Sequence, residues 1–156
     1  MYLSLTKKDD SWKPSNNLGA VYLDMAMAAP KSQQAALVTK AIDQLNISVK
    51  KKENAKNTNN LAVAQTLNGE FTEAKTTATK ALELAKKDNV VKEIKSNLAP
   101  HHIRDGEYEA AITMLGASTL SATSTFNMGL AHLLQNNLDA AKTNLDNATK
   151  DGGSAN

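Results

Sequence analysis

Residues Asn60-Leu61-Ala62 form a short pattern that the chain repeats: an asparagine, a large aliphatic residue and a tiny residue. A second, alanine-rich stretch follows each copy after about the length of one helix. Repetition every roughly 30–40 residues is typical of arrays of small structural units, and it predicts a chain built from stacked helix pairs. The other three copies are Asn17-Leu18-Gly19, Asn97-Leu98-Ala99 and Asn127-Met128-Gly129.

The residues around Asn60 show one unit most clearly. A helix is predicted over 53–68, and Gly69 follows it as the residue that takes the left-handed conformation after a helix end. Gly106 and Asn136 hold the same place in the third and fourth units, since Asn is the next best residue for this conformation. After Gly69, apolar residues recur at the spacing of one helical stripe. They are Phe71, Ala74, Ala78, Ala81, Leu82 and Ala85.

The composition supports an all-helical chain and limits its function. Of the 156 residues, 41% are hydrophobic but only 4% aromatic, and Gly (7) and Pro (3) are scarce. This favours helices that pack closely through small side chains. The net charge of +2 gives no reason to expect nucleic acid or an anionic membrane as a partner. The absence of cysteine excludes disulfides and thiolate metal sites, and no segment reaches the ~20 apolar residues of a membrane helix.

The pattern resembles the tetratricopeptide repeat family from about Trp12 to Lys150. The resemblance implies an all-α fold, a right-handed α-solenoid of antiparallel helix pairs with about eight helices. In that family the first helix of a unit carries Asn-Leu-Gly, and a turn Gly, an aromatic residue and two Ala mark the second helix. The matching residues are Leu18, Gly19 and Tyr22 in the first unit, Leu61, Gly69, Phe71, Ala74 and Ala81 in the second, Leu98, Gly106, Tyr108 and Ala111 in the third, and Met128, Gly129, Asn136, Leu138, Ala141 and Ala148 in the fourth.

The repeats divide the chain into two tails and four units. Residues 1–11 are predicted to be either the tail of a preceding helix, because Leu3 and Leu5 are apolar, or disordered. Residues 151–156 are predicted to be a flexible tail. Since both ends of the array look cut, we expect the chain to be a piece of a longer protein. The units are expected at about 12–48, 53–88, 90–117 and 120–150.

Two places depart from a regular array. In the first unit, a helix over 15–28 starts at Pro14, where proline is tolerated. A turn at Ala29-Pro30-Lys31 leads to the second helix, and residues 46–52 are predicted to be a linker. Pro100 falls inside the first helix of the third unit, where it should kink or break the helix because it removes a hydrogen bond.

The resemblance implies a concave face, lined by the first helix of each unit, that binds a partner protein or peptide. Asparagine amides on this face could hold a peptide backbone, or they could tie neighbouring helices together, and the sequence favours neither. Lys13 and Lys56 lie one turn before Asn17 and Asn60 and could hold a carboxylate, although Glu93 stands where a third lysine would help. The predicted partner-binding residues are Lys13, Asn17, Lys56, Asn60, Val63, Asn97, Arg104, Asn127 and Leu130.

Further residues are expected on the same face, and the fourth unit is markedly apolar there. It either binds a hydrophobic side chain of the partner or is covered by a helix outside this chain. These further candidates are Asn16, Asn59, Leu67, Ile103, Phe126 and Leu133.

The sequence gives no reason to assign a catalytic residue. His102 and His132 hold equivalent positions, but no carboxylate is placed to complete a metal site with them. There is no Ser-His-Asp grouping of helpful spacing, no Gly-rich phosphate loop and no paired His-Glu motif on a helix. We therefore expect that the chain is not an enzyme and uses no metal or cofactor.

The leading interpretation is a protein–protein interaction scaffold. The alternative is a structural spacer or self-association segment of a larger cell-envelope protein, with the fourth unit joining copies into a homo-oligomer. The non-catalytic arm of an enzyme is ranked third. The Asn-, Lys- and Thr-rich sequence is similar to repeat proteins of the bacterial cell envelope, so the interpretation of the compartment leans to the periplasm or envelope, with the cytoplasm as the other choice.

Overall fold

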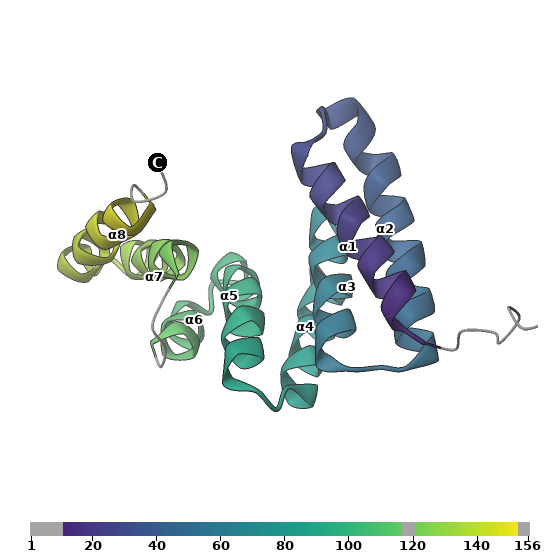
Figure 1. Ribbon diagram of the computed structural model, residues 1–156. Coiled ribbons are helices and arrows are strands. Elements are labelled where there is room, and N and C mark those ends of the chain that lie inside the picture. The colour runs from purple at the N-terminus through teal and green to yellow at the C-terminus, as the bar shows by residue number, and fades with distance from the viewer. Residues whose placement is uncertain (1–10, 117–120, 153–156) are drawn as a thin grey trace, which may run out of the picture. The chain divides into compact units, whose positions relative to one another are not determined.

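The computed structural model describes residues 11–116 and 121–152, which form eight helices and no strand (Figure 1). The all-α class predicted from the sequence is therefore confirmed. Of the predicted tails, residues 1–10 and 153–156 lie outside the described part. The helices are α1 (Lys13–Ala28), α2 (Lys31–Lys51), α3 (Ala55–Leu67), α4 (Phe71–Leu84), α5 (Asp88–Arg104), α6 (Tyr108–Leu115), α7 (Ala122–Leu134) and α8 (Leu138–Gly152).

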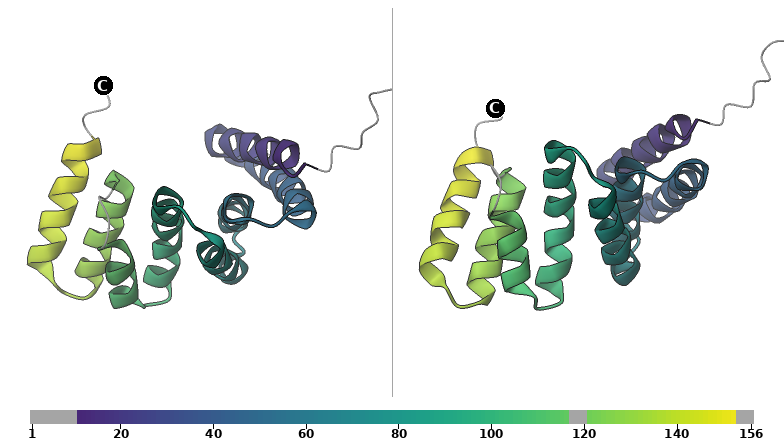
Figure 2. Two further views of the ribbon diagram at one scale, coloured as in Figure 1. Left: turned by 60° about the horizontal axis from the view of Figure 1, so that its bottom comes forward. Right: turned by 90° about the horizontal axis from the view of Figure 1, so that it is seen from below.

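The helices belong to two compact units, α1–α4 and α5–α8, which divide between Ala85 and Lys86. In each unit, consecutive helices pack in pairs, α1 with α2, α3 with α4, α5 with α6 and α7 with α8. Figure 2 shows the last pair, α7 in green and α8 in yellow, lying side by side. The second helix of one pair also packs against the first helix of the next, as α2 does against α3 and α6 against α7. The predicted packing in pairs is therefore confirmed.

Each unit has its own hydrophobic core, built largely from alanine and leucine. Alanine allows helices to approach closely, so few large side chains are needed between them. The core of the first unit contains Leu23, Ala41, Leu45, Leu61 and Ala64. The core of the second contains Ala99, Ile103, Ala111, Leu115, Met128 and Ala131.

Three of the turns inside helix pairs share one backbone geometry. Gly69, Gly106 and Asn136 have positive φ angles of 83°, 79° and 62°, which confirms the left-handed conformation predicted for them. After Gly69, the N–H of Glu70 donates to the carbonyl of Gln65 at 2.9 Å, and equivalent bonds close the other two turns. These bonds pair carbonyls that the helix ends would otherwise leave open.

Gly19 of α1 lies so close to α2 that a larger residue would force a shift. A Cβ atom at this position would lie 2.6 Å from Cγ of Leu45, and Leu45 is fully buried. Gly129 of α7 meets Leu145 of α8 in the same way, at 2.8 Å. The tiny residue of the repeated pattern therefore marks the contact between the paired helices.

The predicted linker over 46–52 is wrong, because α2 continues through Lys51. The reason is tertiary: Ser48 is completely buried and donates a hydrogen bond to the carbonyl of Trp12 at 2.9 Å, while Val49 packs against the core. These contacts hold a polar segment in a helix that its sequence alone does not predict.

The predicted break at Pro100 is also not found. Helix α5 runs from Asp88 to Arg104 with Pro100 inside it. The side chains of Leu98 and Ala99 are buried, and this packing offsets the hydrogen bond that the proline removes. At the other end of the chain, α8 continues through Gly152, two residues into the segment predicted to be a flexible tail.

Replacing Gly19 by valine should destabilise the protein, because the new side chain has to displace Leu45. Overpacking costs about 1–3 kcal/mol, whereas valine gains only about a few tenths of a kcal/mol over glycine in helix propensity. Chemical denaturation followed by circular dichroism measures the net loss. Ala36→Val, at an exposed position of α2, is the matched control and should cost less than about 0.7 kcal/mol. Equal losses in the two variants would contradict the close approach.

Replacing Gly69 by alanine should cost about 1–2 kcal/mol, because a residue with a Cβ atom is disfavoured at this φ angle. No atom of the described residues lies within 4 Å of the place that the Cβ would take, so the cost comes from the backbone alone. Gly69→Asn should lose less, since asparagine tolerates the conformation. Thermal unfolding compares the two variants, and a larger loss with asparagine would argue against this explanation.

Candidate functional site

In the first unit, the first helices of the two pairs lie in contact, α1 against α3. A hydrogen bond joins them: Nδ2 of Asn60 donates to Oδ1 of Asn16 at 3.0 Å. Nδ2 of Asn16 in turn faces Oδ1 of Asn17 at 3.4 Å. Two of the predicted binding residues, Asn17 and Asn60, are thus brought together through Asn16. The bond gives Asn60 a structural role, and a role of these asparagines in binding stays a prediction.

Two further predicted candidates do not reach the surface. Asn16 is 1% exposed and Asn59 is 2% exposed, so the expectation that they line an open face is wrong. Both side chains lie in the interior of the unit, where Oδ1 of Asn16 accepts the hydrogen bond from Asn60. Buried polar groups of this kind are nearly always hydrogen-bonded. The buried Asn16 therefore serves to join α1 to α3.

A second buried polar cluster joins the ends of α1, α2 and α3. Nδ2 of Asn57 donates to Oγ of Ser48 at 3.0 Å and to the carbonyl of Lys52 at 2.9 Å. Its Oδ1 accepts from the backbone N–H of Asn54 at 3.0 Å, and the Asn54 side chain caps α3 in return. The spacing of Asn54 and Asn57 is that of a capping box. This was the signal in the sequence that could have revealed the cluster.

The remaining predicted residues of the first unit differ in exposure. Lys13 at the start of α1 and Lys56 near the start of α3 are exposed. Val63 is half-buried and packs against the core of the unit. The two lysines are therefore open to solvent-borne anions, whereas Val63 contributes mainly to packing.

In the second unit, α5 and α7 are the first helices and are also in contact. Oγ of Ser124 donates to Oγ of Ser96 at 2.9 Å, which joins these helices much as Asn16 and Asn60 join α1 and α3. Among the predicted residues, Asn127 is buried and Asn97 is half-buried. Arg104 is exposed and forms an ion pair with Asp105 at 2.8 Å.

One helix of the second unit presents a row of large apolar side chains to solvent. On α7, Phe126 is 51% exposed and Leu133 is 45% exposed. Leu130 lies between them in the row and is partly buried against the core. Ile103, predicted on the same face, is instead 8% exposed and belongs to the core, so that expectation is wrong.

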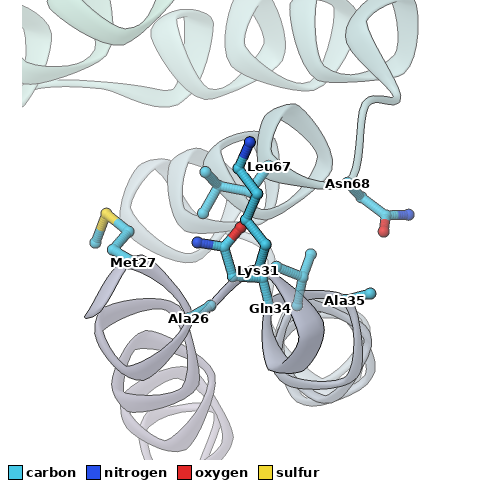
Figure 3. Close-up of a pocket in the computed structure, with 8 residues that line it drawn as sticks. Ala26, Met27, Lys31, Gln34, Ala35, Leu67 and Asn68 are labelled. Carbon is cyan, nitrogen blue, oxygen red and sulfur yellow. The ribbon is translucent and has the colours of Figure 1, made fainter. Parts of the chain in front are cut away.

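A pocket of about 340 Å³ opens in the first unit, at the end where α1 turns into α2. Figure 3 shows Met27 from α1, Lys31 and Gln34 from α2, and Leu67 from α3 around it. Its volume is at the lower end of the range for small-molecule sites. Leu67, predicted on the concave face, lines this pocket together with Asn68. The sequence pattern did not reveal the pocket, because its lining comes from three helices.

Neither a cluster of metal ligands nor a membrane-spanning helix is found among the described residues. Across residues 11–116 and 121–152, no three His, Asp or Glu side chains come together as metal ligands. Nδ1 of His102 contacts Oε2 of Glu107 at 2.5 Å, which ties the end of α5 to the start of α6. None of the helices in the described part of the chain combines the length and the apolar character needed to cross a bilayer.

Comparison with models of protein families finds no match to this chain, and comparison with curated proteins finds none either. The function therefore has to be inferred from the residues and contacts described above.

The Asn16–Asn60 contact predicts a measurable coupling between the two side chains. Asn16→Ala and Asn60→Ala should each lower the free energy of unfolding. The double variant should lose about 0.5–1.5 kcal/mol less than the sum, since the first substitution already removes the bond. Urea denaturation of the four proteins gives the coupling energy. Pairing Asn60→Ala with Asn46→Ala, at an exposed position of α2, should give additive losses, and additivity in the first cycle as well would argue against the tie.

Proposed function

We propose that this chain is a protein-interaction scaffold of the tetratricopeptide-repeat kind, which binds a partner protein or peptide on the face formed by its first helices. The observation that carries the proposal is the apolar row on α7, in which Phe126 and Leu133 are exposed and Leu130 between them is partly buried. Contiguous apolar surface is usually kept small unless something covers it. A partner with apolar side chains would bury this row and gain the corresponding hydrophobic free energy.

The way the helices are held supports this role. The pairs α1–α3 and α5–α7 are each joined by hydrogen bonds between side chains, Asn60 to Asn16 and Ser124 to Ser96. First helices fixed in this way present a surface that needs little ordering when a partner binds. In the proposal the pairs stack as a right-handed superhelix, and the exposed Lys13 and Lys56 contact acidic groups of the partner. The role needs no catalytic residue, metal or cofactor.

Self-association is the second candidate, because the apolar surface extends beyond the row. Leu134 is 48% exposed and Leu138 at the start of α8 is 60% exposed. A second copy of the chain could cover these residues together with Phe126 and Leu133. The chain would then act as a spacer or joining segment of a larger envelope protein, and no separate peptide ligand would be required.

Peptides selected on the native chain from a random displayed library should contain large apolar residues and should bind through α7. Phe126→Ser should weaken their binding at least about tenfold, which corresponds to ~1.4 kcal/mol, because aromatic anchors carry much of the energy of an interface. Fluorescence anisotropy with labelled peptides measures the affinity. Leu84→Ser, which changes an exposed apolar residue of α4, is the matched control and should leave binding unchanged.

Two results would count against the scaffold. If selection yields no peptides, or if they bind native chain and Phe126→Ser equally well, the row on α7 is not a binding surface. Light scattering distinguishes the second candidate: a dimer of the native chain that becomes a monomer in Phe126→Ser would show that the row joins copies of the chain.

A further inference from the structure

The pocket at the turn from α1 into α2 has mainly apolar walls. Its buried lining includes Ala26 and Val38, which are 2% and 3% exposed. Two large apolar side chains border it and remain open to solvent, Met27 at 59% and Leu67 at 45% exposure. A ligand with an apolar body would cover these two side chains and gain the corresponding hydrophobic free energy.

Lys31 adds a positive charge to these walls. In Figure 3 its side chain is extended, and its amino group points toward Leu67. Within the described part of the chain, no carboxylate pairs with Lys31, and the lining of the pocket contains no Asp or Glu. An ammonium group without a partner at the edge of an apolar pocket attracts an anion.

Two amides complete the polar part of the lining. Nε2 of Gln34 donates to the carbonyl of Ala29 at 3.2 Å, which holds this amide at the turn, and an amide nitrogen has a second hydrogen to donate. Nδ2 of Asn68 donates to Oε1 of Glu70 at 2.6 Å. Gln34 is therefore the amide suited to an anion, because Asn68 already binds a carboxylate that would repel a second one.

The charge and the size of the pocket limit the class of anion. The ammonium of Lys31 balances one negative charge, whereas a phosphate group is normally held by several donors, such as an arginine fork or a row of backbone N–H groups. The volume of about 340 Å³ corresponds to roughly ten water-sized groups at ~30 Å³ each. A singly charged small molecule with a short apolar chain fits both limits.

We propose that this pocket binds a small monocarboxylate with a short apolar chain. The carboxylate contacts Nζ of Lys31 and the amide N–H of Gln34, and the chain lies against Met27, Val38 and Leu67. This site goes beyond the scaffold function and does not depend on it, because the pocket and the apolar row on α7 share no residue.

Hexanoate is the probe, titrated into the isotope-labelled full chain and followed by NMR. Hexanamide has the same chain without the charge, and acetate has the charge without the chain. Hexanoate should shift the backbone signals at the end of α1, the start of α2 and the end of α3, and the shifts should saturate. Hexanamide should bind about fivefold more weakly and acetate at least about tenfold more weakly, because each lacks one of the two interactions.

Substitutions separate the charge from the apolar wall. Lys31→Gln should weaken hexanoate binding about fivefold and leave hexanamide binding unchanged, since only the charge is removed. Lys50→Gln, at an exposed position of the same helix outside the pocket, is the matched control and should leave hexanoate binding unchanged. Leu67→Ala should weaken the binding of both molecules about threefold, because it shortens one wall. The NMR signals of each variant also report whether it is folded.

Each outcome decides the proposal. Equal binding of hexanoate and hexanamide, or equal losses in Lys31→Gln and Lys50→Gln, would overturn the assignment of a carboxylate. Shifts that do not saturate, or that fall on α7 instead of the pocket, would overturn the site itself. Failure here is distinguishable from failure of the scaffold, because peptide binding to α7 is measured with Phe126→Ser and is not affected by Lys31→Gln.

Discussion

Each unit depends on how closely its paired helices can approach. At Gly19 and Gly129 the backbone of one helix lies against a leucine of its partner. Alanines such as Ala41 and Ala131 are fully buried elsewhere. Tiny residues bring helix axes close together, so the dispersion contacts between backbones replace those that large side chains would supply. This explains how a chain with 4% aromatic residues can bury a hydrophobic core in each of its two units.

A core of small residues specifies helix register weakly, since many alanine faces fit one another about equally well. Buried polar contacts supply the missing specificity. Asn57 can satisfy both ends of its amide only when α2 and α3 are correctly placed. Asn16 requires α3 beside α1 in the same way. A wrong register would leave these amides unpaired in the interior, at a cost of about 1–3 kcal/mol each.

The sequence predicted features that depend on one segment and missed those that depend on several. Gly69 and Asn136 could be placed in left-handed turns, because a helix end and its glycine or asparagine are close in the chain. The length of α2 could not be predicted, because the buried Ser48 is hydrogen-bonded to Trp12 at the start of α1 and to Asn57 of α3, which are distant from it in the local sequence pattern. The same limit applies to the site: an asparagine that faces a peptide and one that faces a helix, as Asn60 does, look alike in sequence.

The division of the chain between Ala85 and Lys86 has a thermodynamic consequence. The two core clusters share no residue, and in repeat proteins stability is approximately a sum of local terms. The close contact of a glycine with a leucine of the paired helix occurs in both units, at Gly19 in the first and at Gly129 in the second. The effect of a substitution at one of these glycines on the stability of its unit can therefore be compared with the unchanged unit in the same molecule and the same solvent.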